Sequence, residues 1–370
     1  MRKVTGEPLG LQSELLEEPA GRRGCAQRKR REGRRGERHR RSNRLCESRN
    51  SNIFAPPHTH STRKMRRVLA SQRRALCQQA QSGKSTHFGF RSVPEDEKEH
   101  MVGHVFSSVA SRYDIMNDVM SCGVHRVWKD MFVGMIGVKE MGKEDLQVLD
   151  VAGGTGDISF RIAHQIAALR RSKAGSSWRS DDEEAEGLAG VGGPCITVSD
   201  INKDMLENGR IRAQQLEAAG NPDTWPRMEW VTADAEQLPF DDCSFDVYTI
   251  AFGIRNVTRM ENALREAKRV LRPGGRFLCL EFSRVRNPLL RMMYERYSFD
   301  VIPRMGQLVA DDRASYQYLV ESIQQFPEQE VFAQRIRDAG LRCVSHTNLT
   351  NGVVAVHSAI KLPDPPVYAP

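Results

Sequence analysis

The residues of this sequence that are best suited to chemistry form a glycine-rich turn between two acids. The stretch 146–160 reads LQVLDVAGGTGDISF. It predicts an apolar strand over 147–151, a tight turn that includes Gly153, and a helix with an apolar face over 158–169. A strand, a glycine turn and a helix in this order are typical of α/β folds that bind nucleotides.

The residues around the turn indicate which nucleotide it could hold. No Gly-Lys-Ser/Thr follows the glycines, as a P-loop requires. Ile158 and Ser159 stand where a dinucleotide fingerprint has its last glycine, and Asp150 and Asp157 would repel a phosphate. A cofactor with positive charge fits better, and S-adenosylmethionine carries an ammonium and a sulfonium. An ordinary strand-to-helix turn remains the alternative for this stretch taken alone.

Two further acids stand at the ends of predicted strands. PCITVSD ends at Asp200, whose carboxylate can accept both hydroxyls of a ribose. Asp200 lies 44 residues beyond Gly156 because a polar, acidic insertion over 172–193, which we expect to be disordered, lengthens the connection. MEWVTAD ends at Asp234, which could bind an adenine amino group while the backbone N–H of Ala235 reaches a ring nitrogen. A cap of the following turn is the alternative for Asp234.

A fourth predicted strand, 245–251, is apolar almost throughout, as a central strand buried on both faces should be. Arg255 and Asn256 follow it. Open α/β sheets bind ligands at the carboxyl ends of their strands, so these two side chains are candidates for a site. The last two strands flank Asn351-Gly352, which predicts an antiparallel hairpin.

A predicted helical pair over 105–133 precedes the glycine turn. Val124, Val127, Trp128 and Met131 fall on one of its apolar stripes, which predicts that they point inward. The stripes are separated by YDIMNDVMSCGVHRVW, which is rich in polar side chains, among them Tyr113 and His125. Caps and turns explain any one of these side chains, whereas together they could form a lid over a cofactor.

A second unusual segment, 287–326, is rich in Met, Tyr, Leu and Arg. It is longer than a strand-to-helix connection needs, which favours a substrate lid. A basic, apolar helix also suits a bilayer surface or a lipid tail, and core packing is the alternative for any single side chain. The sequence has no run of about 18 apolar residues, so we expect no membrane span.

The charge of the chain is unevenly distributed. Residues 1–92 hold 23 Lys and Arg against 7 Glu and no Asp, so the net charge of +8 divides into +16 in this leader and −8 in the rest. The leader has too few apolar residues to bury a core, and we expect it to be disordered. From Met65 it is acid-poor, Arg-rich and amphipathic, which favours a mitochondrial transit peptide over a nucleic-acid-binding arm. The negative body argues against a nucleic-acid substrate.

The eight cysteines form no C-x-x-C pair, so we expect neither structural zinc nor a disulfide framework, and no metal site. The five strands of the α/β units and the terminal hairpin together predict a seven-stranded sheet. This order resembles the class I S-adenosylmethionine-dependent methyltransferase fold, which is Rossmann-like with an antiparallel end. We place the domain at 93–362.

Two long motifs narrow the resemblance. YDIMNDVMSCGVHRVW (113–128) and RVLRPGGRFLCLEFS (269–283) closely match the signature stretches of the ubiquinone/menaquinone biosynthesis C-methyltransferases. DINKDML, DAEQLPF and AFGIRNV agree as well, and the resemblance extends over residues 86–361. STHFGFRSV and the insertion are similar to the mitochondrial animal members.

The resemblance implies roles for individual residues. S-adenosylmethionine contacts are implied at Gly153, Thr155, Asp200, Asp234 and Ala235. Catalytic roles are implied for Arg255 and Asn256. The pKa of an arginine is too high for a base, which favours Arg255 as the stabiliser of a phenolate, with a water molecule taking the proton. Tyr113 and His125 are alternative proton acceptors or substrate contacts. The sequence departs from the family pattern at Ala152, where glycine is frequent, and at Ala251, where some bacterial members have serine.

The implied reaction is methylation of a ring carbon of a polyprenylated methoxy-benzoquinol in ubiquinone biosynthesis. The implied setting is the matrix face of the mitochondrial inner membrane, with peripheral membrane contact and a multi-subunit complex of ubiquinone-biosynthesis enzymes; a homodimer is also compatible. Demethylmenaquinone methylation and a non-catalytic scaffold of that complex are the alternatives. A scaffold would be expected to lose the cofactor acids, which are all present.

Overall fold

The computed structural model describes residues 85–109, 113–176, 193–219 and 224–363. The strands are β1 (Ser85–Phe88), β2 (Arg91–Pro94), β3 (Gln147–Val151), β4 (Cys195–Asp200), β5 (Arg227–Thr232), β6 (Phe245–Ala251), β7 (Leu271–Phe282), β8 (Arg342–Leu349) and β9 (Val354–Ile360). The α-helices are α2 (Glu95–Val109), α3 (Tyr113–Ser121), α4 (Val124–Ile136), α5 (Val138–Met141), α6 (Asp157–Ser176), α7 (Lys203–Ala219), α8 (Met260–Val270), α9 (Pro288–Arg296), α10 (Ile302–Ala310), α11 (Arg313–Gln325) and α12 (Gln329–Asp338). Short helical turns are η2 (Ile254–Asn256), η3 (Tyr297–Val301) and η4 (Thr350–Gly352).

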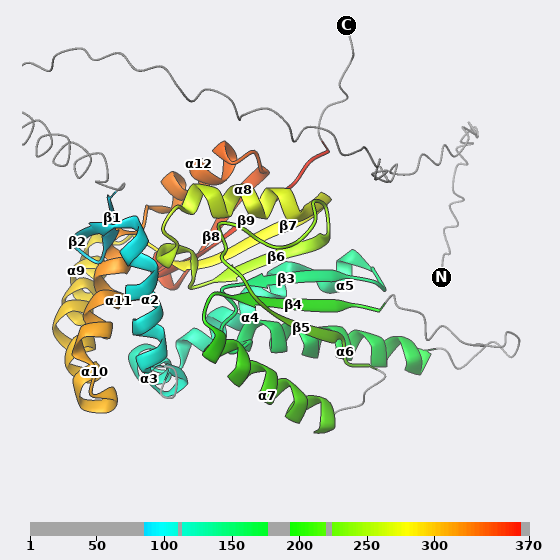
Figure 1. Cartoon of the computed structure of the whole chain (residues 1–370), viewed down its shortest axis with the longest axis horizontal. Helices are drawn as coiled ribbons and strands as arrows, with labels where there is room; N and C mark the ends of the chain where they lie inside the picture. The colour runs from blue at the N-terminus through cyan, green and yellow to red at the C-terminus, as the bar shows by residue number, and fades with distance from the viewer. Residues whose placement is uncertain (1–84, 110–112, 177–192, 220–223, 364–370) are drawn as a thin grey trace, which may run out of the picture. The chain divides into compact units, whose positions relative to one another are not determined.

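A seven-stranded sheet organises the domain (Figure 1). Its strand order is β5-β4-β3-β6-β7-β9-β8, with parallel pairing except for the two pairs that contain β9. The predicted class I fold with its antiparallel end is therefore confirmed. The chain changes direction across the sheet between β3 and β6, and this is the place where open α/β sheets bind ligands.

Helices cover both faces of the sheet. Figure 1 shows α4, α6 and α7 on one side and α8 and α12 on the other. Each side has its own buried apolar cluster, one around Phe132 and Ile162 and the other around Leu264 and Phe332. A further group of helices, α2, α3 and α9 to α11, stands beyond one edge of the sheet.

The folded part begins earlier than predicted, because residues 85–94 were assigned mostly to the disordered leader. They form the β1–β2 hairpin, which Phe88 anchors by stacking on Tyr318 with ring centroids 4.0 Å apart. The insertion also differs at its start, since 172–176 complete α6. The transit-peptide prediction and positions 177–192 of the insertion lie outside the described residues.

Helix α4 turns a partly different face inward from the one predicted. Trp128 of α4 is buried as predicted, whereas Val124, Val127 and Met131 are 38%, 55% and 45% exposed. His125 and Lys129 are buried beside Trp128 instead. A stripe predicted from apolar residues alone cannot include His125 and Lys129. These polar side chains are buried because α4 lines the site described below.

Candidate active site

The glycine turn after β3 is shaped by close approach to its neighbours. A Cβ atom on Gly153 would lie 2.7 Å from Cγ1 of Val198 on β4, and Gly156 has a φ of +80°. Ala152 has a φ of 51°. The αL region disfavours residues with a Cβ atom, so a glycine at position 152 would be less strained than the alanine.

Asp200 closes the turn from the next strand. Its Oδ2 accepts a hydrogen bond from the backbone N–H of Gly154 at 2.9 Å, and its Oδ1 accepts one from Asn202 at 2.8 Å. Each oxygen retains acceptor capacity, so the carboxylate can still bind a diol. Burial raises the pKa of Asp200, because the charged form has lost water.

Asp150 lies behind the turn and is fully buried. Its carboxylate accepts hydrogen bonds from the hydroxyls of Ser159 at 2.6 Å and Thr249 at 2.8 Å. Burial raises its pKa to about 6, the two hydroxyls oppose that shift, and the negative charges of Asp200 and Asp157 add to it. Three carboxylates therefore face one small region, which suits a cationic ligand and excludes a phosphate.

These groups line the first of two adjoining pockets, a cavity of about 170 Å³. Its wall includes all five residues predicted to bind the cofactor, namely Gly153, Thr155, Asp200, Asp234 and Ala235. The residues of this wall thus fit S-adenosylmethionine in charge and in place. Asp234 also accepts a hydrogen bond from the N–H of Glu236 at 2.9 Å, so it caps a turn as well.

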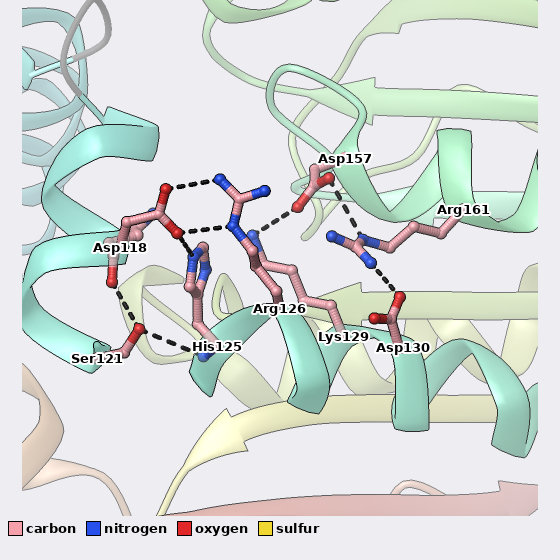
Figure 2. Close-up of polar contacts among 9 residues, drawn as sticks. Asp118, Ser121, His125, Arg126, Lys129, Asp130, Asp157 and Arg161 are labelled. Carbon is pink, nitrogen blue, oxygen red and sulfur yellow. Dashed lines mark hydrogen bonds and ion pairs between the residues drawn. The ribbon is translucent and has the colours of Figure 1, made fainter. Parts of the chain in front are cut away.

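Lys129 is a further charged residue of this wall that the sequence interpretation missed. Its Nζ donates to Oδ2 of Asp157 at 2.7 Å, and Figure 2 shows Asp157 between Lys129 and Arg161. This ion pair holds the pKa of Asp157 below its usual value against the effect of burial, which acts in the opposite direction. No motif marks Lys129, since it stands among apolar residues of a helix.

The second pocket adjoins the first, and Phe106, Lys129 and Phe252 line both. Its other lining residues are mostly aromatic or apolar. Arg255 and His125 also line this pocket and are polar. A flat ring held there would lie next to the cofactor pocket, as methyl transfer between the two requires.

Arg255 is held rigidly at the second pocket. Its Nη1 donates to Oε1 of Glu281 at 2.8 Å and also to the carbonyl of Phe252, while the guanidinium carbon lies 5.5 Å from the ring centroid of Phe282. Both Arg255 and Glu281 are almost fully buried. The Nε–H of Arg255 has no partner among the described residues, so it remains available to a ligand.

Asn256 contributes differently from its neighbour. It lines the first pocket, and its Oδ1 accepts a hydrogen bond from the hydroxyl of Tyr318 at 2.9 Å. Tyr318 belongs to α11 and lines the second pocket, as part of the 287–326 segment for which a substrate lid is predicted. Asn256 therefore links the wall of one pocket to the wall of the other.

The comparisons with known proteins identify the family of this chain. A family model described as "ubiE/COQ5 methyltransferase family" matches residues 94–361. The chain belongs to the ubiE/COQ5 methyltransferase family. The predicted resemblance is confirmed, and the protein is a methyltransferase that uses S-adenosylmethionine.

Individual relatives are similar over most of their length. The chain is 47% identical to a protein of Danio rerio over 324 residues, which cover 82% of this chain and 95% of that protein. It is 50% identical to a protein of Bos taurus over 301 residues, covering 78% and 87%, and 50% identical to one of Dictyostelium discoideum over 278 residues, covering 75% and 86%. All three are named mitochondrial 2-methoxy-6-polyprenyl-1,4-benzoquinol methylase.

Two candidate residues of the signature stretch 113–128 have different outcomes. The structure places His125 in the wall of the second pocket. Tyr113 is the first residue of α3, and its side chain lies outside the described residues.

Within the described part of the chain, no group of three or more His, Cys, Asp and Glu could hold a metal ion, and no helix is long and apolar enough to cross a membrane.

Proposed function

We propose that this protein methylates a ring carbon of a polyprenylated methoxy-1,4-benzoquinol in ubiquinone biosynthesis. The observation that carries the proposal is the shared wall of the two pockets, formed by Phe106, Lys129 and Phe252. It places an acid-lined cavity beside one lined by aromatic side chains. The names of the relatives supply the acceptor, a 2-methoxy-6-polyprenyl-1,4-benzoquinol.

The residues divide the work between binding and catalysis. S-adenosylmethionine, when bound, supplies a methyl group activated by a sulfonium. Gly153, Thr155, Asp200, Asp234 and Ala235 hold this cofactor at the first pocket. Holding the ring carbon and the methyl group in line removes several kcal/mol from the barrier.

Arg255 and Asn256 act on the acceptor side. The free Nε–H of Arg255 stabilises the negative charge that a ring hydroxyl develops when it loses its proton. A phenolate raises the electron density of the ring carbon next to it, which makes that carbon a better nucleophile. Asn256 positions Tyr318 against the ring through the hydrogen bond from the tyrosine hydroxyl.

An apolar surface beside the second pocket suits a lipid substrate and a membrane. On α9, Leu289, Met292 and Met293 are 61% to 64% exposed, and Leu308 of α10 is 84% exposed. The side chain of Arg296 is 85% exposed on the same helix pair. We therefore infer that this surface, Leu289 to Leu308, contacts the membrane peripherally.

The pocket and the proposed membrane surface are connected through packing. Ile302 of α10 packs with Tyr316 and Val320 of α11, and α11 lines the second pocket. A polyprenyl tail that stays in the bilayer can then extend from a ring bound near α11. The names of the relatives support a mitochondrial location. We further propose a place at the matrix face of the inner membrane, in a complex with the other ubiquinone-biosynthesis enzymes and with a homodimer as one arrangement.

The acceptor is tested by comparing two quinols with the full chain. Reduced short-tail methoxybenzoquinone and reduced short-tail demethylmenaquinone are offered separately with S-adenosylmethionine, and kcat/KM is measured for each. We expect the benzoquinol to be preferred by at least about tenfold, because the relatives are named for a single-ring acceptor. Preference for the naphthoquinol would indicate a role in menaquinone biosynthesis instead of ubiquinone biosynthesis. Cofactor binding without methyl transfer to either quinol would favour a scaffold.

A further inference from the structure

His125 and Asp118 form a hydrogen-bonded pair at the turn between α3 and α4 (Figure 2). Nε2 of His125 lies 2.8 Å from Oδ1 of Asp118. The turn itself is fixed locally, since Oγ of Ser121 accepts the backbone N–H of His125 at 3.3 Å and donates to the carbonyl of Asn117 at 2.6 Å. Gly123, with a φ of +77°, allows the chain to reverse between the two helices.

The protonation of this pair is set by its other neighbours. Arg126 donates to both oxygens of Asp118, at 2.7 and 2.6 Å, and this pairing holds the pKa of Asp118 well below its usual range. Asp118 is therefore an acceptor only, and the proton of the His125–Asp118 bond lies on Nε2. Burial lowers the pKa of His125, the bond to Asp118 opposes this, and the positive charge of Lys129 lowers it further.

A neutral imidazole whose Nε2 carries the proton has a lone pair on Nδ1. Nδ1 of His125 is buried without a partner among the described residues, and the side chain is only 9% exposed. Of the buried side-chain atoms without a partner, the ones on residues of the second pocket are Nδ1 of His125 and Nε of Arg255. One is an acceptor and the other a donor, and a phenolic hydroxyl needs both.

Lys129, Arg255 and Tyr318, which also line this pocket, are not available as bases. Lys129 donates to Asp157, and Arg255 is a guanidinium paired with Glu281. Tyr318 keeps its proton at neutral pH, because burial raises its pKa to about 12. Asp157 does not line the second pocket.

We propose that His125, oriented by Asp118, is the general base that accepts the proton of the acceptor's ring hydroxyl on Nδ1. This rests on the proposed function, which supplies a phenolic acceptor. In the step the O–H bond breaks, an N–H bond forms on Nδ1, and the electron pair stays on the oxygen beside the donor of Arg255. The imidazolium is balanced by the Asp118 carboxylate. After methyl transfer the methylated carbon loses its own hydrogen as a proton to solvent, and the ring oxygen regains the proton held on Nδ1. One proton is therefore released for each methyl group gained.

The first test needs no turnover and no cofactor. The full chain is mixed with 2-methoxy-4-nitrophenol, a methoxyphenol whose ionised form absorbs visible light. We expect the wild type to bind it as the phenolate below the pH at which it ionises in water, and His125→Gln to lose this ionisation. Equal ionisation in both proteins would overturn the proposal.

The second test is the pH dependence of kcat/KM at saturating cofactor, with His346→Gln as the control for loss of a histidine. The wild type and the control should lose activity as the pH falls and His125 gains a proton. His125→Gln should lose this acidic limb and at least about 100-fold of the rate, with unchanged cofactor affinity. Persistence of the limb in His125→Gln would contradict the base assignment.

Asp118→Asn covers the case in which His125→Gln does not fold, because the Asp118 side chain is 35% exposed. Since the carboxylate raises the pKa of His125, its loss should move the acidic limb to lower pH and reduce the rate. An unmoved limb would overturn the orienting role. Phenolate binding in a wild type that does not methylate benzoquinol would support the base and count against the proposed acceptor.

Discussion

At the scale of residues, charge decides what the first pocket holds. Asp150 is fully buried with a pKa of about 6, and burial also raises the pKa of Asp200. A positive ligand would relieve the repulsion between these acids and favour their ionised forms. The acids that made a phosphate unattractive in the sequence are thus the groups that suit a sulfonium and an ammonium.

This charge predicts that cofactor affinity depends on pH. Because the pKa of Asp150 is raised, the group gains a proton as the pH falls through about 6, and the pocket loses negative charge. We expect the affinity for S-adenosylmethionine to fall by up to about tenfold per pH unit below about pH 6. Calorimetric titration between about pH 5 and about pH 7.5 measures it, with S-adenosylhomocysteine, which lacks the sulfonium charge, as a less pH-sensitive control. An affinity that does not change with pH would contradict this role of the acids.

A second residue-scale prediction concerns Arg255. Arg255→Lys keeps a positive charge beside Glu281 but removes the Nε–H, so kcat should fall on the order of 100-fold while cofactor affinity stays within about twofold. Arg255→Ala is a poor test, because it leaves Glu281 buried without its partner at a cost of about 3–5 kcal/mol. Steady-state kinetics and calorimetry on Arg255→Lys separate the two effects. A large loss of cofactor binding would refute the assignment to the acceptor side.

At the scale of elements, the β1–β2 hairpin supports the second pocket from outside. Phe88 stacks on Tyr318, and the backbone N–H of Phe90 donates to Oε2 of Glu321 at 3.0 Å. Both partners belong to α11, whose Tyr318 reaches Asn256. The hairpin therefore fixes the position of α11 and with it one wall of the pocket.

This support predicts the effect of Phe88→Ala. The variant should lose about 3 kcal/mol of unfolding free energy, because a buried ring is removed from its stack. KM for the quinol should rise, since Tyr318 loses its neighbour, whereas cofactor affinity should not change. Exposed Phe90, at 52%, provides the matched control Phe90→Ala. Equal KM values for wild type and Phe88→Ala would show that α11 needs no support from the hairpin.

The elements also show where the sequence was informative. The seven strands of the large sheet could be predicted because each apolar run ends at an acid or a turn that periodicity detects. The full inward face of α4 could not be predicted, because His125 and Lys129 are buried where α4 lines a pocket, and periodicity does not reveal a pocket. Tyr318 was missed for a related reason, since it reaches the site from a segment 62 residues after Asn256.

At the scale of the whole molecule, the parallel sheet brings together residues that are far apart in the chain. The predicted cofactor residues share one pocket because they follow β3, β4 and β5 at the same edge. The second pocket depends on packing between α2, α4 and α11, which no local pattern predicts. Its boundaries were therefore beyond sequence reasoning, although His125 and Arg255 were named as candidates.

The apolar surface of α9 and α10 predicts binding to a bilayer. The full chain should sediment with lipid vesicles, and a triple change to serine at Leu289, Met292 and Met293 should weaken this at least about tenfold. A salt concentration of about 0.5 M screens the basic leader during the measurement. Ile211→Ser with Val331→Ser removes exposed apolar side chains elsewhere and should have no effect. Equal loss in both variants would exclude α9 as the contact.

The central claim is that the two pockets form one centre for methylation of a ring carbon. The most direct measurement incubates the full chain with methyl-labelled S-adenosylmethionine and a reduced short-tail methoxybenzoquinone under reducing conditions, with Asp200→Ala as the control. We predict that the label appears on a ring carbon of the product with the wild type and is absent with Asp200→Ala. Label on an oxygen, or cofactor binding by the wild type without any transfer, would contradict the account.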